Sequence, residues 1–176
     1  MKIAIFGKRR QSPDDLRHIT ALMDRLAELD IFVSIDRHFF DAMTRATGSP
    51  LPADDVFDDD DFTADFCFSI GGDGTFLRTA RRVAVKEIPI IGFNTGHLGF
   101  LAEQSIASAP AMVDRLLSGD YTVESRSLLE GKGIGGKVKA GVSGWGFALN
   151  EIAILRQDTA SMITVHTHLD GMPVAP

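Results

Sequence analysis

A buried-type strand that runs straight into a glycine-rich loop constrains this chain more than any other feature. Residues 66–70 read Phe-Cys-Phe-Ser-Ile, and Gly71-Gly72-Asp73-Gly74-Thr75 follows without a break. The apolar residues that come next predict a helix from about Thr75 to Val85. In an open α/β sheet, a loop between a strand and the following helix lies at the carboxyl end of the strand, where ligands bind.

Strands and helices alternate on both sides of this loop, which predicts a parallel sheet, because strands that run parallel need a crossover between them. Residues 2–6 read as a buried strand, and Ile31–Ile35 reads as a second one. Between them, apolar residues spaced by three and four predict a helix from about Pro13 to Leu29, with Ser12 as its N-cap. The other expected elements are a short helix within Phe39–Ala46, a strand over 88–93 and a helix over Pro110–Leu117.

The pattern changes after about Asp120, where short apolar segments alternate with glycine-rich turns. The strands expected there are Tyr121–Leu129, Val138–Val142, Trp145–Leu149, Glu151–Leu155 and Met162–Leu169, followed by a turn at Asp170-Gly171. The sequence thus predicts an α/β fold. A parallel-sheet domain is expected over residues 1–120 and the beginning of an all-β domain over residues 121–176, with the boundary near 119–125.

The Gly71–Thr75 loop carries the residues best suited to bind a phosphorylated ligand. Its glycines let the backbone approach a ligand closely, and the N–H groups at the start of the next helix can receive phosphate oxygens. Asp73 repels phosphate, so its presence points to a hydroxyl group: a carboxylate can accept the proton of a sugar hydroxyl that attacks a phosphoryl group. The alternative is that Asp73 only caps the helix and the glycines only form a tight turn.

A second polar loop with glycines, Asn94-Thr95-Gly96-His97-Leu98-Gly99-Phe100, follows the strand at 88–93. Two such loops after two buried strands can flank one crevice. Asn94 offers a hydrogen-bond donor and an acceptor, and Phe100 can stack on a base. Alternatively, Phe100 is an ordinary core residue. For His97 we favour a structural role, because no other type of metal ligand lies nearby in the sequence.

Three segments in this order resemble the motifs of the NAD kinase family: Gly71-Gly72-Asp73-Gly74-Thr75-Phe76-Leu77, Asn94-Thr95-Gly96-His97-Leu98-Gly99-Phe100-Leu101 and Leu149-Asn150-Glu151. The first motif also occurs in diacylglycerol and sphingosine kinases, and phosphofructokinases carry a close variant, but the second motif separates NAD kinases from them. The resemblance covers nearly all of the chain. It implies a Rossmann-like N-terminal domain and phosphoryl transfer from ATP or polyphosphate to the 2′-hydroxyl of the adenosine ribose of NAD, which gives NADP.

The resemblance also implies roles for individual residues. Asp73 would be the general base on the 2′-hydroxyl. The other implied site residues are Gly72, Gly74 and Thr75 near the dinucleotide, Arg78 facing the phosphates, Asn94 in the second motif, Phe100 against the adenine, and Asn150 and Glu151 on ribose hydroxyls. The resemblance further implies Mg²⁺ or another divalent cation that bridges the donor phosphates rather than a protein metal site, and a homodimer or homotetramer.

The family's later loop, rich in Thr, Gly, Ser and Tyr, is expected beyond His168–Asp170 and does not occur in this sequence. We therefore expect a chain truncated at its C-terminus, with part of the binding cleft missing and its own activity left open. Two other functions also stay open. One is a lipid kinase that shares the glycine loop, which predicts a different second motif and association with membrane surfaces. The other is a catalytically silent nucleotide-binding module.

Charge and composition argue against several other classes of protein. The net charge of −6 disfavours a nucleic-acid partner, because phosphate backbones are bound mainly by Lys and Arg. Cys67 is the single cysteine, so an intrachain disulfide is excluded, and its apolar surroundings in the sequence fit a buried thiol. The apolar runs are too short for a signal peptide or a membrane span, so we expect a cytoplasmic protein without a membrane partner.

Four other motifs are weaker candidates for function. Asp54–Asp61 lacks the spacing and the glycine of a calcium loop and reads as a solvated acidic loop. Gly131–Gly136 matches a dinucleotide fingerprint, but no helix follows it, so we expect a hairpin. His166 and His168 lack a third metal ligand. Lys8-Arg9-Arg10 either meets donor phosphates or forms a solvated basic turn.

Overall fold

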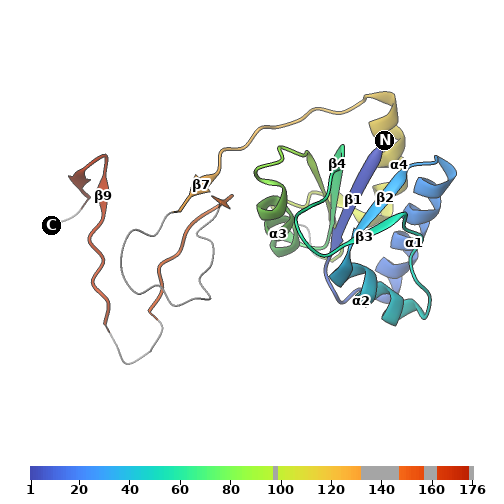
Figure 1. Ribbon diagram of the computed structural model, residues 1–176, viewed down its shortest axis with the longest axis horizontal. Helices are drawn as coiled ribbons and strands as arrows, with labels where there is room; N and C mark the ends of the chain where they lie inside the picture. The colour runs from blue at the N-terminus through green and yellow to red at the C-terminus, as the bar shows by residue number, and fades with distance from the viewer. Residues whose placement is uncertain (97–98, 132–146, 157–161, 175–176) are drawn as a thin grey trace.

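A parallel sheet of six strands, in the order β3-β2-β1-β4-β5-β6, forms the N-terminal part of the chain (Figure 1). The computed structural model describes residues 1–96, 99–131, 147–156 and 162–174. The strands of the sheet are β1 (Lys2–Gly7), β2 (Phe32–Asp36), β3 (Asp55–Phe57), β4 (Phe66–Ile70), β5 (Ile90–Asn94) and β6 (Gln104–Ser105). This strand order is that of a Rossmann fold, so the expected α/β fold is confirmed.

Helices connect the strands as the apolar spacing predicts. They are α1 (Pro13–Glu28), α2 (Arg37–Thr47), α3 (Asp73–Val83) and α4 (Ala109–Ser118), the last preceded by a 3₁₀ turn, η1 (Ile106–Ser108). Ser12 caps α1 as expected: its side chain accepts a hydrogen bond from the backbone N–H of Asp15, whose carboxylate accepts one from the N–H of Ser12. Helix α2 begins after Asp36, whose carboxylate accepts from the N–H of Phe39.

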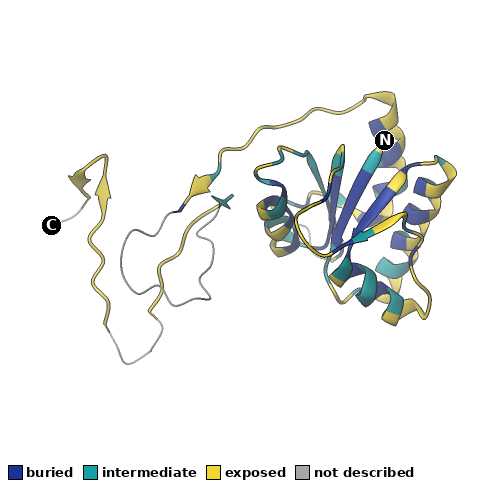
Figure 2. Ribbon diagram, viewed as in Figure 1, coloured by how far each residue is buried: buried dark blue, intermediate teal, exposed yellow. Residues whose placement is uncertain are grey.

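The sheet buries a different cluster on each face. In β1, Ile3 and Ile5 point into the larger cluster, which the buried residues of α1, α2 and α4 complete. Ala4 and Phe6 point to the opposite face, where Val83 of α3 and Phe57 and Phe62 pack. Helix α3 therefore lies on the other side of the sheet from α1, and the strands between them are the most deeply buried part of the chain (Figure 2).

The acidic run Asp54–Asp61 differs from the solvated loop that we expected. Residues 55–57 form the edge strand β3, parallel to β2. The carboxylate of Asp54 accepts from the N–H of Val33 at 2.7 Å, and that of Asp55 accepts from the hydroxyl of Ser34 at 3.2 Å. The prediction of a loop is wrong for residues 55–57, which pair with a neighbouring strand, but Asp54 and Asp55 are exposed as expected. Asp58–Asp61 are exposed.

Arg82, near the end of α3, ties this acidic run to the sheet. Its guanidinium carbon lies 5.3 Å, 5.5 Å and 5.9 Å from the ring centres of Phe6, Phe57 and Phe62. The same guanidinium donates to the Asp36 carboxylate at 2.7 Å and to that of Asp60 at 2.5 Å. Because the Arg82 and Asp36 side chains are only 23% and 11% exposed, this pair is largely shielded from water.

Replacing Arg82 with alanine is expected to lower the free energy of unfolding by about 3 kcal/mol, because the buried Asp36 carboxylate then loses its cation. Arg37→Ala is the matched control. It removes an ion pair with Asp58 from the same acidic run, but the Arg37 side chain is 43% exposed, and such pairs contribute about 1 kcal/mol or less. Urea denaturation measures both values, and equal losses would contradict the role assigned to Arg82.

After α4 and its C-cap residue Gly119, the described chain is extended and pairs only in short antiparallel ladders (Figure 1). Strand β7 (Leu129–Glu130) pairs with β8 (Phe147–Ala148), and β9 (His168–Leu169) pairs with β10 (Met172–Pro173). Positive φ angles at Asp170 and Gly171 confirm the predicted turn between the last two strands.

The longer strands expected in this part are wrong where the structure describes them. Residues 121–128, 151–155 and 162–167 have no ladder partner among the described residues, and an extended segment becomes a strand only when a neighbour supplies hydrogen bonds. The strand at Val138–Val142, the start of Trp145–Leu149 and the glycine hairpin beyond Gly131 lie outside the described residues. The domain boundary near 119–125 stays a prediction.

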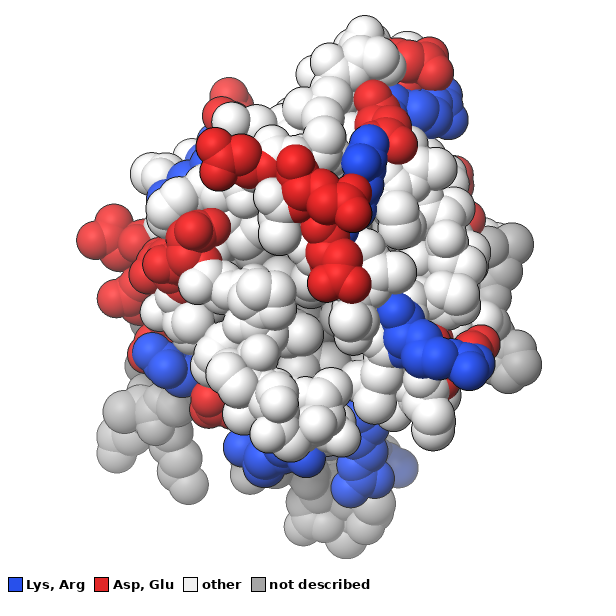
Figure 3. All heavy atoms as spheres, turned by 90° about the vertical axis from the view of Figure 1, so that its right-hand side faces the viewer, with Lys and Arg blue, Asp and Glu red and all other residues white. Residues whose placement is uncertain are grey.

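The remaining expectations concern the thiol, the surface charge and the membrane. Cys67 is fully buried in β4, and burial raises the pKa of its thiol to about 12, which confirms a structural cysteine. On the face turned toward the viewer in Figure 3, Asp and Glu form several groups over the centre and the left-hand side, and Lys and Arg are scattered around them. Among the described residues, the helices are all too short or too polar to cross a bilayer.

Candidate active site

The Gly71–Thr75 loop lies at the point where the strand order of the sheet reverses. From β1 the chain adds β2 and β3 on one side, and β4, β5 and β6 on the other. Backbone hydrogen bonds continue past the strand ends: the N–H of Lys8 donates to the carbonyl of Ile70 at 2.9 Å, and that of Gly71 donates to Phe93 at 2.8 Å. In open α/β folds, ligands bind outside the carboxyl ends of the strands at this position.

The glycines of the loop are needed for two different reasons. A Cβ atom on Gly71 would lie 2.4 Å from the hydroxyl of Thr75, which is itself buried, so no side chain fits there. Gly72 and Gly74 have open space around the position of a Cβ. A ligand can therefore approach the backbone at residues 72 and 74 from outside the protein.

Asp73 is the first residue of α3 and not its cap. Gly72 occupies the cap position, without a side-chain hydrogen bond, so the alternative reading of Asp73 as a helix cap is wrong. The carboxylate turns instead toward the end of the second motif. Its Oδ2 accepts from the N–H of Phe100 at 3.0 Å, and its Oδ1 accepts from the N–H groups of Leu101 at 3.0 Å and Ala102 at 3.2 Å. Two motifs that lie far apart in the sequence thus meet at one carboxylate.

These three hydrogen bonds lower the pKa of Asp73, chiefly those from Leu101 and Phe100, against a smaller opposing effect of desolvation. The group is ionised at neutral pH. A carboxylate has about four lone-pair sites, and the backbone uses three of them, two on Oδ1 and one on Oδ2. Oδ2 therefore keeps one site that can accept a hydrogen bond from a hydroxyl group.

The titration of Asp73 should reflect this arrangement. We expect its carboxyl carbon, followed by NMR, to titrate below the ordinary Asp value of about 3.9. Folding lowers this pKa, so ionised Asp73 stabilises the folded loop at any pH above its ordinary pKa. This stabilisation is lost as the pH falls through the lowered pKa of the folded protein. A midpoint at or above the ordinary value would contradict the three hydrogen bonds.

Gly99 explains how the carboxylate comes so close to the second loop. A Cβ atom on Gly99 would lie 2.2 Å from Oδ1 and 2.7 Å from Cγ of Asp73. The contributions of Gly99, Leu101 and Ala102 were not predicted from the sequence. The glycine was visible in the motif, but the two N–H donors were not, because every non-proline backbone carries one.

Two of the other expected site residues are buried. Asn94 ends β5 and is 6% exposed. It lines a pocket of about 300 Å³ together with residues from the start of α1 and the end of β6. Thr75 is also 6% exposed, and its hydroxyl accepts a hydrogen bond from Arg78 at 3.2 Å. The Thr75 side chain therefore packs beneath Gly71.

Phe100 is 92% exposed, so the alternative of an ordinary core residue is wrong. Arg78 is exposed and turns back toward the start of α3. Asn150 and Glu151 are exposed too, and no hydrogen bond between described residues joins them to the Asp73 loop. His97 lies outside the described residues.

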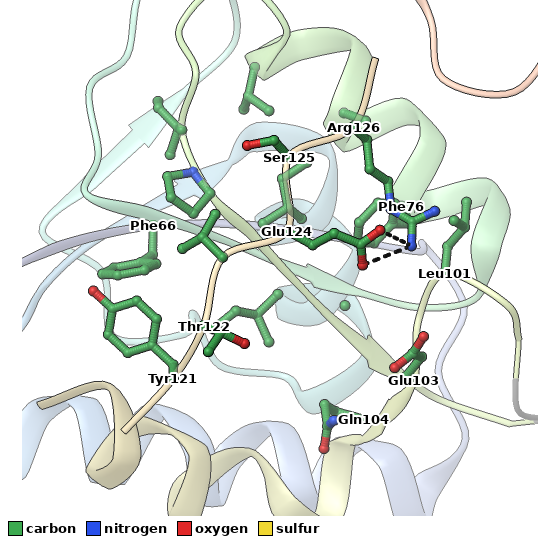
Figure 4. A pocket seen from close by; sticks show the side chains of 18 of the residues that line it. Phe66, Phe76, Leu101, Glu103, Gln104, Tyr121, Thr122, Glu124, Ser125 and Arg126 are labelled. Carbon is green, nitrogen blue, oxygen red and sulfur yellow. Dashed lines mark hydrogen bonds and ion pairs between the residues drawn. The ribbon is translucent and has the colours of Figure 1, made fainter. Parts of the chain in front are cut away.

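A larger cavity, of about 800 Å³, lies beside β5 and is lined by residues of α3, α4 and the extended segment 121–128 (Figure 4). Its walls combine apolar and polar side chains, and the ring of Tyr121 packs edge-on against Phe66 with 5.4 Å between ring centres. Glu124 and Arg126 form an ion pair of 3.2 Å along its rim. Neither Asp73 nor the glycines at 71–74 line it, so this cavity is not the site that the motifs indicate.

Within the described residues, no group of three or more His, Cys, Asp or Glu side chains is placed to hold a metal ion. His166 and His168 are exposed and belong to no such group.

Comparisons with known proteins agree with this geometry. The model of the ATP-NAD kinase N-terminal domain matches residues 35–121. An NAD kinase from Bacteroides fragilis is 40% identical over 97% of the chain, and one from Porphyromonas gingivalis is 40% identical over 96%. The chain spans 57% and 56% of the lengths of these two relatives.

A solved structure supports the fold. A yeast NADH kinase crystallised with NADH superposes with a TM-score of 0.55 over 67% of this chain and 36% of its own, at 19% sequence identity. At that identity the likeness concerns the fold alone. Because the matched domain and the two bacterial relatives cover the motifs at Asp73 and Phe100, the chain is similar to NAD kinases along nearly its whole length, and residues 35–121 match their N-terminal domain.

Proposed function

We propose that the protein transfers the terminal phosphoryl group of ATP or polyphosphate to the 2′-hydroxyl of the adenosine ribose of NAD, with Asp73 as the proton acceptor. One observation carries this proposal. An ionised carboxylate at the carboxyl edge of the sheet is fixed by three backbone N–H groups and keeps one acceptor site on Oδ2. That site suits a hydroxyl donor and not a phosphate.

The reaction balances with this single acceptor. The 2′-oxygen of the ribose attacks the terminal phosphorus, and a new P–O bond forms. The bond from that phosphorus to the bridging oxygen breaks, so ADP or a shortened polyphosphate leaves. The hydroxyl proton passes to Asp73. A weakly basic carboxylate suffices because the transition state of phosphoryl transfer is loose and positioning supplies most of the catalysis.

The surrounding residues fit the roles that the family resemblance implies. The open backbone at Gly72 and Gly74 would let the dinucleotide approach, and exposed Phe100 would stack on the adenine. Arg78 would face the phosphates, and Asn150 and Glu151 would hold ribose hydroxyls. For Asn94 and Thr75 we propose that they shape the site, since their side chains are buried.

Several finer points belong to the same proposal. A divalent cation would arrive with the donor phosphates. We further propose a cytoplasmic location, a homodimer or homotetramer, and a second domain that begins at residues 121–176. The short antiparallel ladders after Gly119 support the last point.

The test is direct product formation by the full chain. We expect NADP when the protein is incubated with NAD, Mg²⁺ and either ATP or polyphosphate, detected by a dehydrogenase that reduces NADP but not NAD. Diacylglycerol serves as the competing acceptor. A phosphorylated lipid without NADP would favour the lipid kinase, and dinucleotide binding without either product would favour the silent nucleotide-binding module.

A further inference from the structure

The side chain of Lys8 lies across the carboxyl end of β4. Lys8 directly follows β1, and its ammonium group donates to the carbonyl of Thr95, directly after β5, at 2.6 Å. Since β4 is the strand between β1 and β5, the side chain must pass over the end of β4 to reach that carbonyl. The ammonium group therefore lies beside the turn at Gly71 and Gly72, two residues before Asp73.

This positive charge has little to neutralise it. An ammonium group has three N–H donors. In the part of the chain that the structure describes, Thr95 supplies the hydrogen bond of the Lys8 ammonium, and no carboxylate lies within ion-pair distance of it. Lys8 is half-buried. The start of α3 adds a partial positive charge at the same strand end.

An independent observation concerns two of the residues that hydrogen-bond to Lys8, Thr95 and Gln11. Thr95 is 6% exposed, and its hydroxyl oxygen has no hydrogen-bond partner among the described residues. Gln11 donates to the carbonyl of Lys8 at 3.3 Å, and its side-chain oxygen is likewise buried without a partner in the described part of the chain. Buried polar atoms are normally paired, because leaving them unpaired costs free energy. The Thr95 hydroxyl can donate to a phosphate oxygen, beside an ammonium group that attracts one.

We propose that Lys8 and Thr95 form a subsite for the phosphate chain of the phosphoryl donor, above the glycine turn. The inference rests on the proposed function. There, Asp73 acts on the hydroxyl group that accepts the phosphoryl group, and the subsite would hold the donor of that group. ATP and inorganic polyphosphate share the chemistry that the subsite recognises. The proposed subsite also assigns the two roles considered for Lys8-Arg9-Arg10, phosphate binding and a solvated basic turn. Lys8 binds phosphate, whereas Arg9 and Arg10 are exposed on the turn.

Calorimetric titration of the full chain with inorganic tripolyphosphate tests the subsite. We expect Lys8→Met to weaken tripolyphosphate binding by about tenfold or more, as for the loss of a charge-assisted hydrogen bond. Arg9→Met is the matched control, because it removes the same charge from the next residue, and it should have a much smaller effect. Equal losses in the two variants, or none in Lys8→Met, would overturn the proposal.

Thr95→Val separates phosphate binding from a purely structural role. The variant keeps the shape and the main-chain carbonyl that Lys8 uses, but it removes the hydroxyl without a partner. We expect weaker tripolyphosphate binding together with an unchanged or raised melting temperature. A lowered melting temperature with normal tripolyphosphate binding would show that Thr95 is only structural and would overturn its assignment.

Two further binding measurements, with ATP and with NAD, identify the ligand of the subsite and test the subsite separately from the proposed function. ATP should lose affinity in Lys8→Met in parallel with tripolyphosphate. A loss for ATP alone would place Lys8 on the nucleoside and overturn the phosphate subsite. NAD binding should be the same in Lys8→Met and the unmodified protein. If the unmodified protein makes no NADP, the proposed function fails, whereas the subsite is decided by tripolyphosphate binding alone.

Discussion

The full chain with Asp73→Asn is expected to lose about 10³-fold in kcat for NAD phosphorylation, the range that a general base contributes, while its affinity for NAD changes little. An amide cannot take up the hydroxyl proton at neutral pH. The measurement is steady-state NADP formation, with NAD binding determined separately by calorimetry.

The hydrogen bonds at Asp73 predict what else this substitution changes. If the amide oxygen keeps the N–H groups of Leu101 and Ala102, the amide NH₂ faces the N–H of Phe100, and two donors oppose each other. One backbone hydrogen bond of the second loop is lost, so a modest loss of stability should accompany the loss of turnover. The free energy of unfolding should be measured beside kcat for this reason.

Asp54→Ala is the control for that structural effect, because alanine removes the acceptor of one backbone hydrogen bond outside the candidate site. The Asp54 carboxylate also accepts a backbone hydrogen bond, from Val33 at 2.7 Å, but it lies at the edge of the sheet in the acidic run. We expect lower stability and normal kcat. Near-normal kcat in Asp73→Asn would remove the general base from the proposal. Equal losses of kcat and NAD affinity would show that Asp73 only holds the second loop in place.

The sequence predicted the sheet well because each helix and strand carries its own periodic pattern. Helix α1 is an example: Ser12, Pro13 and the apolar spacing predict its start, and the structure begins it at Pro13. The short strands after Gly119 were predicted poorly. A strand depends on a neighbouring chain, and the apolar pattern of residues 121–128 carries no information on whether that neighbour is there.

Part of the candidate site was also predictable, because local sequence patterns identify it. Three glycines after a buried strand identify a ligand-binding turn, and Asp73 stands out because its charge does not suit phosphate. Its fixation was not predictable, because it depends on backbone groups of residues 100–102 that any sequence would offer. The partial burial of Lys8 and its reach across β4 follow from the strand order, which becomes known only with the fold.

Gly99→Ala is expected to lower kcat by about 10²-fold, the effect of displacing a catalytic group by about 1 Å. The new methyl carbon would occupy a position 2.2 Å from Oδ1 and 2.7 Å from Cγ of Asp73, far inside van der Waals contact. Either the carboxylate leaves its position beside the second loop, or the loop moves and breaks its three hydrogen bonds. Both outcomes disturb the proton acceptor without changing its chemistry.

The two outcomes differ in the pKa of Asp73, which NMR titration of the variant can follow. Loss of the hydrogen bonds should raise this pKa toward its ordinary value, because they are the main cause that lowers it. Glu103→Ala is the control: it changes an exposed side chain of the same loop and should leave both kcat and the pKa of Asp73 unchanged. A Gly99→Ala variant with normal kcat would mean that catalysis does not depend on where this carboxylate lies, and the role of Asp73 as proton acceptor would fail with it.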